Sequence, residues 1–288
     1  RYAIQNVFRN EKPSNGRYRE FLQGDFDIIG NVNFAQANAE LCNLISTTLK
    51  DIGLNKDQFT INVSNRKIVQ GLIDDLKISK DKQLKVIRAI DKLDKPGFGL
   101  KGVEDLLKKE RKDKSGAITK GADLTNDQVA KILNFLKMKD LKELKENIKN
   151  PLSQEGIKEL EEVFEVISYG SNSNQVKTNF TIVRGLAYYS DFILETNLNF
   201  KVTNNKGKRV DLGSICSGGG YAKLISRFKG VDVPGTGISF GIDRLLFALI
   251  QLDQIKIEDQ KPVLVCVMEQ KYLKNYYEIV DLLRDNNI

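Results

Sequence analysis

A Lys-rich helical segment separates two parts of the chain that both contain β-strand patterns. Residues 66 to about 150 hold 22 of the 45 Lys and Arg residues and 14 of the 38 Asp and Glu residues, a net charge of +8, whereas the remainder carries −1. Leu84, Ile87, Ile90 and Leu93 recur there at helical spacing. The strands on either side of this segment must therefore form their sheet around a helical insertion.

The segment before the insertion predicts a hairpin, a helix and a strand. Apolar residues of 2–8 and 18–28 flank a polar loop over 10–16, which is typical of a long-looped β-hairpin. A helical stripe runs over 34–52, and alternation at 59–63 indicates a short strand.

The segment after the insertion predicts further strands and ends in helices. We expect a helix near 157–167, strands at 180–183 and 192–202, a hairpin turn at 204–207, a helix over 243–252, a strand at 263–267 and a helix over 271–284. The predicted fold class is α+β, an antiparallel sheet flanked by helices. Its predicted divisions are a first part of the core (1–65), a helical insertion (66–175), a second part of the core (176–259) and the start of a C-terminal α/β domain (260–288).

Composition excludes several kinds of chemistry. The 288-residue chain has no His, so Ser-His and Cys-His nucleophile pairs and His-ligated zinc are excluded. Cys42, Cys216 and Cys266 are far apart and odd in number, which argues against a disulfide framework and favours a reducing, cytoplasmic compartment. The longest apolar runs are far shorter than a membrane span, and no signal peptide precedes Arg1, so we expect no membrane association and a chain cut from a longer protein.

Arginines gather in the predicted hairpin loop. Arg9, Arg17 and Arg19 surround it, and Arg is suited to polyanions because its planar guanidinium stays charged and binds phosphate or carboxylate bidentately. On the following strand Gln23, Asp25 and Asp27 share one face. Each feature alone also fits an ordinary exposed hairpin or a solvated sheet face.

Two later segments combine glycine with Arg or Tyr. Arg184-Gly185-Leu186-Ala187-Tyr188-Tyr189 follows a predicted strand, and Gly235 to Arg244 is a glycine-punctuated strand that enters a helix. The glycine spacing matches neither a Rossmann nor a P-loop motif. Taken alone, a strand end with packed tyrosines and a tight strand–helix contact explain both segments.

In this order, the motifs resemble the class II aminoacyl-tRNA synthetases, and among these the histidyl-tRNA synthetases. FRNEKPSNGRYREF resembles the family's motif 2, QGDFDIIG its continuation, RGLAYY the histidine-recognition signature commonly written RGLDYY, and GTGISFGIDRLL motif 3. The Lys-rich unit lies where the family has its insertion domain. The chain's end resembles the opening of the anticodon-binding domain, and motif 1 is absent.

The resemblance implies a role for each matching residue. Arg9 would bind the ATP α-phosphate and the histidine carboxylate, Glu11 the adenine amine, Arg17 the β- and γ-phosphates, and Arg244 the γ-phosphate. Arg184 would lie over the α-phosphate. The implied histidine site also comprises Gln23, Asp27, Tyr188, Tyr189 and Tyr221.

The function that the resemblance implies is a histidine–tRNA ligase. It would activate histidine with ATP and Mg²⁺ and transfer it to the 3′ end of tRNA(His), as a homodimer in the full-length protein. The basic insertion also fits a polyanionic partner, although a solvated Lys-rich surface explains it equally well. A plain RNA-binding protein leaves motif 3 unexplained.

Three positions depart from the family pattern, and an alternative stays open. The segment commonly written GGRYDGL is Gly218 to Leu224 here, with Gly220 at the Arg position and Ala222 at the Asp position, and Ala187 replaces the Asp of RGLDYY. The alternative is a non-catalytic paralogue that serves as the regulatory subunit of ATP phosphoribosyltransferase. The retained Arg9 and Arg184 speak against it, because a regulator does not need arginines that bind phosphate.

Overall fold

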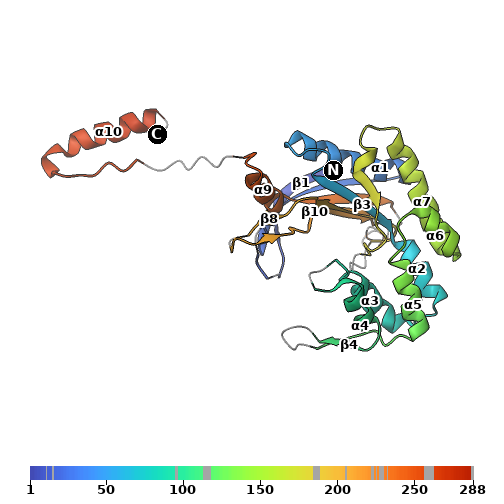
Figure 1. The fold of residues 1–288 in the computed structure, drawn as a ribbon. Helices are drawn as coiled ribbons and strands as arrows, with labels where there is room; N and C mark the ends of the chain where they lie inside the picture. The colour runs from blue at the N-terminus through green and yellow to red at the C-terminus, as the bar shows by residue number, and fades with distance from the viewer. Residues whose placement is uncertain are drawn as a thin grey trace.

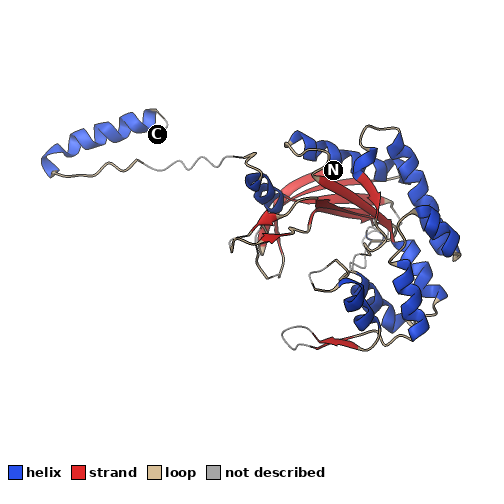
Figure 2. Ribbon diagram, viewed as in Figure 1, coloured by secondary structure: helices blue, strands red, loops and turns tan. Residues whose placement is uncertain are grey.

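A seven-stranded sheet lies at the centre of the molecule (Figures 1 and 2). This computed structural model describes residues 1–10, 12–14, 16–94, 97–112, 118–183, 189–204, 206–221, 224, 226, 230–231, 233–255 and 263–286. In spatial order the strands are β1 (Tyr2–Phe8), β2 (Glu20–Ile29), β11 (Gly235–Gly241), β10 (Ser214–Gly220), β7 (Phe192–Leu198), β3 (Phe59–Asn65) and β6 (Val176–Thr178). Among the described strands of this sheet, β3 and β6 alone pair in parallel, and the predicted antiparallel sheet is confirmed.

The first two strands form the predicted hairpin. Its loop begins with a backbone hydrogen bond from Arg9 N to Arg19 O (2.7 Å), and Ser14 and Arg17 pair across its tip. Gly16 has a φ of +65°, and a Cβ there would meet the Arg244 backbone at 3.4 Å. Glycine therefore lets the loop tip lie directly on α9 (Ile242–Gln251).

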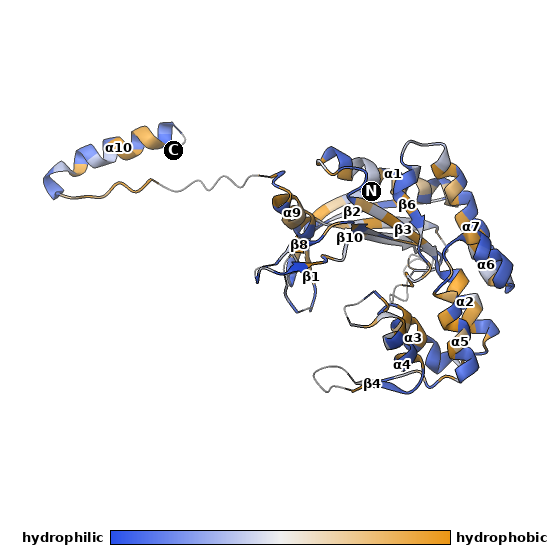
Figure 3. Cartoon of the chain, in the orientation of Figure 1, coloured by the Kyte–Doolittle hydropathy of each residue, from blue (hydrophilic) through white to orange (hydrophobic). Residues whose placement is uncertain are grey.

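Two long helices cover one face of the sheet (Figure 1). In α1 (Phe34–Asp51) the apolar stripe is buried, and the Asn33 side chain caps the first turn by accepting from Gln36 N. α7 (Pro151–Ser168) packs against α1, against β3 and against α2 (Arg66–Asp75) of the insertion. Figure 3 shows apolar colour on the inner sides of these elements. The opposite face of the sheet stays open toward the insertion.

The Lys-rich segment forms the predicted helices, and their buried apolar residues belong to the same core cluster as those of the sheet and of α1. Ile87 and Ile90 of the predicted stripe are buried, whereas Leu84 is exposed (42%); Val129 and Ile132 are buried as well. Its elements are α2 (Arg66–Asp75), α3 (Lys80–Ile90), α4 (Gly99–Leu107), β4 (Glu110–Lys112), β5 (Ile118–Lys120), α5 (Asn126–Phe135) and α6 (Leu141–Asn147). The β4–β5 hairpin was not predicted.

Two predicted strands are wrong. Residues 180–181 lie in a turn and 182–183 in irregular structure, because the Asn179 side chain accepts from Thr181 N (3.1 Å) and from the Thr181 hydroxyl (2.6 Å) and so closes a local loop in place of a ladder. Residues 263–267 have no assigned secondary structure and pair with no strand among the described residues, and a lone strand has nothing to complete its backbone hydrogen bonds.

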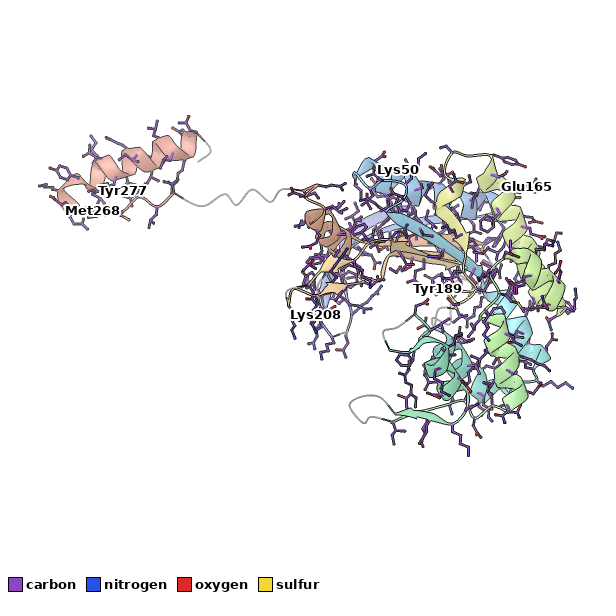
Figure 4. The ribbon with its side chains drawn as sticks, viewed as in Figure 1. Lys50, Glu165, Tyr189, Lys208, Met268 and Tyr277 are labelled. Carbon is purple, nitrogen blue, oxygen red and sulfur yellow. The ribbon has the colours of Figure 1, made fainter. Side chains whose placement is uncertain are left out.

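The remaining predicted elements are present. They are the hairpin of β8 (Val202–Thr203) with β9 (Arg209–Val210), α9, and α10 (Leu273–Asp285), which follows the short turn η2 (Gln270–Tyr272); a second short turn, η1 (Ser173–Gln175), precedes β6. Helix α10 has no buried residue and lies apart from the sheet with Met268 and Tyr277 (Figures 1 and 4). Of the helices that the structure describes, none is long and apolar enough to cross a bilayer.

Candidate functional site

The open face of the sheet carries polar and glycine residues in rows that run across the strands. In antiparallel pairing, residues directly opposite each other point to the same face. Asp25 of β2 lies opposite Ser239 of β11, which lies opposite Ser217 of β10, which in turn lies opposite Glu195 of β7. Four adjacent strands thus contribute one continuous polar row.

The neighbouring row is almost free of side chains. Asp27 lies opposite Gly237, and Gly237 lies opposite Gly219. A Cβ on Gly237 would stand 2.3 Å from Asp27 Oδ1, and one on Gly219 would stand 2.9 Å from the Tyr189 ring. Glycine at these positions leaves a hollow over the sheet beside Asp27.

A cavity of about 370 Å³ occupies this hollow and brings three predicted histidine-site residues together. Asp27, Tyr189 and Tyr221 line it. The Tyr221 hydroxyl donates a hydrogen bond to Asp27 Oδ1. Burial, and then this bond to the carboxylate, raises the pKa of Tyr221, so the phenol stays protonated and remains a donor. The Asp27 carboxylate is therefore held in place by the neighbouring side chain.

Tyr189 is positioned by the junction of β3 and α2. The Arg66 guanidinium donates to Tyr189 O (3.2 Å), and Arg66 N donates to Asp191 O (2.9 Å). Burial lowers the pKa of Arg66. Ser190 N donates to Gly220 O (3.0 Å) from the other side. Figure 4 places Tyr189 at the edge of the sheet that is turned toward the insertion.

The Asp191 carboxylate occupies the space into which a side chain at position 220 would extend. A Cβ on Gly220 would stand 1.8 Å from Asp191 Oδ1. This carboxylate accepts from the Ser190 hydroxyl (2.9 Å) and from Phe192 N (2.7 Å), and burial raises its pKa. The space at Gly220 is thus occupied by Asp191, so an Arg cannot be placed at 220 without moving that carboxylate.

A second cavity, of about 600 Å³, contains the predicted phosphate-binding arginines. Arg9, Arg17, Gln23 and Arg244 line it. The Arg9 guanidinium donates to Gln23 Oε1 (3.4 Å) and lies over the ring of Phe21 (5.1 Å to the centroid). Three positive charges around one space are suited to a polyanion.

Hydrogen bonds hold the start of α9 against the strands beside this cavity. Arg244 donates to Ser214 O, and Asp243 accepts from Leu22 N (2.6 Å). The motif 3 arginine is therefore bound to one strand through its side chain and to another through its neighbour. Across the cavity, Asp91 and Asp94 after α3 contribute a wall from the insertion.

The structure thus gathers seven of the ten predicted site residues in two cavities. Ser239 lines both cavities. Glu11, Arg184 and Tyr188 lie outside the described residues, and their roles stay predictions.

Asp25, Ser239, Asp91 and Asp94 were not among the predicted site residues. Asp25 shares its strand face with Gln23 and Asp27, so the period of two was a signal for it. Ser239 needed the strand register, and the two insertion residues needed the tertiary fold. In the part of the chain that the structure describes, no three His, Cys, Asp or Glu residues are grouped to hold a metal ion.

Comparison with known proteins gives matches along the whole chain. The family model described as histidyl-tRNA synthetase matches residues 2–245. The histidine–tRNA ligase of Pelagibacter ubique is 73% identical over 288 residues, which is 100% of this chain and 62% of that protein. The ligase of Rhizobium meliloti is 39% identical over 300 residues, with 100% and 59% covered. The chain therefore spans about three fifths of the length of these relatives.

Solved structures share the fold. A crystal structure of histidyl-tRNA synthetase from Nostoc sp. PCC 7120 superposes with a TM-score of 0.69 at 26% identity, covering 100% of this chain and 63% of that one. A protein from Bacillus halodurans, described as an ATP phosphoribosyltransferase regulatory subunit/histidyl-tRNA synthetase, gives a TM-score of 0.65 at 18% identity, covering 99% and 65%.

Proposed function

Because this chain belongs to the histidyl-tRNA synthetase family, we propose that it forms the catalytic part of a histidine–tRNA ligase. The observation that carries the proposal is the pair of cavities that adjoin at Ser239, one lined by three arginines and the other by Asp27 and two tyrosines. ATP would occupy the larger cavity and histidine the smaller. The reacting carboxylate and α-phosphate would then meet where the cavities adjoin.

The arginines supply the electrostatics of adenylate formation. Attack of the histidine carboxylate on the α-phosphorus builds negative charge there, and cations fixed beforehand lower that barrier without an enzyme nucleophile. Arg9 would contact the α-phosphate and the carboxylate, and Arg17 and Arg244 the outer phosphates. A chain without His can therefore catalyse this step.

The smaller cavity supplies recognition of the side chain. An imidazole offers an N–H donor and a second ring nitrogen. Asp27, held by Tyr221, would accept from one ring nitrogen, and the Tyr189 hydroxyl would reach the other. Asp27 would reject apolar side chains of the same size, because the buried carboxylate would lose its partner.

Magnesium would enter with ATP as part of the substrate. Mg²⁺ keeps several waters and uses phosphate oxygens with one or two carboxylates, so it needs no cage of protein ligands. Glu195 and Asp211 both line the larger cavity. Their carboxylates suit a phosphate-bound Mg²⁺.

We also propose a tRNA partner, a dimer and a cellular location. The basic insertion, at +8, would contact tRNA(His). The edge strand β1 exposes Tyr2 (74%), Ile4 (60%) and Phe8 (74%), and a homodimer in the full-length protein would cover this apolar row. Among the described residues, Cys42, Cys216 and Cys266 form no disulfide, which favours a cytoplasmic location.

Amino-acid-dependent ATP–pyrophosphate exchange tests the proposal. The full-length protein is assayed with each of the twenty amino acids in turn, beside this 288-residue chain. Exchange with histidine alone supports the ligase. Absence of exchange from the full-length protein, together with retained histidine binding, favours the regulatory paralogue of ATP phosphoribosyltransferase.

A further inference from the structure

We propose that Asp25 is a positioning residue that fixes the side-chain amide of Gln23, and through it Arg9, where the two cavities adjoin. This inference rests on the proposed function for its catalytic consequence. Asp25 is half-buried on the site face of β2, between Gln23 and Asp27. It lines the smaller cavity but makes its hydrogen bonds to residues of the larger one.

The Gln23 amide has a donor end and an acceptor end, and Asp25 decides which way they point. Gln23 Nε2 donates to Asp25 Oδ1 at 2.7 Å. An ionised carboxylate can only accept, so the NH₂ end of the amide must face it. The carbonyl end then faces Arg9, whose guanidinium donates to Gln23 Oε1 at 3.4 Å.

The reverse orientation would be unfavourable at both ends of the amide. It would place a carbonyl oxygen against the Asp25 carboxylate and an NH₂ group against the Arg9 guanidinium. Two acceptors would meet on one side and two donors on the other. The negative charge on Asp25 therefore makes Gln23 an acceptor for Arg9.

A neighbouring strand holds Asp25 itself. The Ser239 hydroxyl donates to the same oxygen, Asp25 Oδ1, at 2.5 Å, and Ser239 is the direct cross-strand partner of Asp25. Hydrogen bonds to a carboxylate are short and strong. A chain of contacts thus runs from β11 through Asp25 and Gln23 to Arg9, which lies on the loop after β1.

These contacts matter for catalysis because of where Arg9 is proposed to lie, beside the reacting phosphate. Arg9 is exposed on a loop, and Phe21 provides a cation–π contact on one side. The Gln23 carbonyl adds a directional contact. A guanidinium displaced by even 1 Å from the reacting phosphate loses much of its effect on the rate.

The test is a double-mutant cycle on the full-length protein, read by histidine-dependent exchange. Asp25→Asn keeps the shape but allows the Gln23 amide to flip, and we expect kcat/KM to fall about tenfold. In a Gln23→Ala background the same change should cost less than about twofold, because no amide is left to orient. Ser239→Ala should give a smaller loss in the wild-type background. Asp51→Asn, at the exposed end of α1, is the control for loss of charge.

A second measurement does not depend on activity. The side-chain amide signal of Gln23 in a ¹H–¹⁵N NMR spectrum is identified by its disappearance in Gln23→Ala. We expect Asp25→Asn to shift it and Asp51→Asn to leave it in place.

The outcomes separate the two proposals. Equal losses from Asp25→Asn in both backgrounds, or an unmoved Gln23 signal, would overturn the role of Asp25. No histidine-dependent exchange from the unaltered protein would overturn the proposed function, and the NMR signal would still decide whether Asp25 orients Gln23.

Discussion

The two cavities are built in different ways, although they share a wall. In the smaller cavity the polar side chains already bond to each other, as Tyr221 does to Asp27, and they stand on or beside central strands. In the larger cavity Arg9 and Arg17 are exposed side chains on a hairpin loop. A rigid pocket is suited to distinguishing one small side chain from others. Long charged side chains on a loop are suited to closing over a flexible polyanion.

Removal of Arg9 should have the largest effect. We expect Arg9→Ala to lower kcat/KM for pyrophosphate exchange about 10²- to 10³-fold, because it removes a cation from the phosphate that reacts. Steady-state exchange at varied ATP measures this. Lys12→Ala, in the same loop but outside the lining of the cavity, is the control. Equal losses from both variants would mean that loop charge in general, and not Arg9, matters.

Asp27→Asn should come next and should affect the other substrate. A charged hydrogen bond contributes about 1.5–3 kcal/mol, so KM for histidine should rise roughly 10- to 100-fold while KM for ATP changes little. Separate titrations of histidine and ATP measure the two constants. A parallel rise in both would contradict the division of the site into two differently built cavities.

Tyr221→Phe sharpens the comparison within the smaller cavity. It leaves the ring in place and removes only the hydroxyl that holds Asp27. We expect KM for histidine to rise about three- to tenfold, which corresponds to one supporting hydrogen bond. Tyr18→Phe, at the larger cavity, is the matched control and should leave KM for histidine unchanged. An unchanged KM in Tyr221→Phe would show that Asp27 does not depend on this support.

Asp191→Asn should affect stability alone, and in a pH-dependent way. Burial raises the pKa of Asp191, so the folded chain holds the proton more tightly than the unfolded chain. Ionisation therefore lowers the free energy of unfolding as pH rises above the ordinary carboxyl range, near 4, and that loss is absent below it. We expect Asp191→Asn to melt at a higher temperature than the unaltered protein at pH 8 and at the same temperature near pH 3. Thermal melts across this range, with Asp51→Asn alongside, measure the difference, and a lower melting temperature at pH 8 would contradict it.

Local sequence patterns predicted most of the fold. The 34–52 stripe became α1, the 59–63 alternation became β3, and the polar loop became the β1–β2 hairpin. The wrong strand at 180–183 arose because Asn179 forms a side-chain turn that an apolar run conceals. The wrong strand at 263–267 has the right composition but no neighbour, and pairing is a property of the tertiary structure.

The site was predictable only as far as its motifs extend. Arg9, Gln23, Asp27 and Arg244 were found because each lies in a recognisable segment. The contact between Asp25 and Ser239 was not, because it joins residues 214 positions apart through the register of two strands. The part of the cavity lining that follows α3 is harder still to predict. Asp91 reaches the cavity through the packing of the insertion helices, which no local sequence pattern indicates.

The glycine row beside Asp27 limits how this protein can evolve. Side-chain pairs across strands normally stabilise a sheet, and Gly237 and Gly219 forgo that contribution at its centre. A larger residue would improve the intrinsic preference for a strand, yet it would fill the hollow in which we propose that the substrate binds. Selection for thermal tolerance therefore has to act on the helices and the opposite face of the sheet. In the middle of the open face, a stabilising side chain would take the space proposed for the substrate.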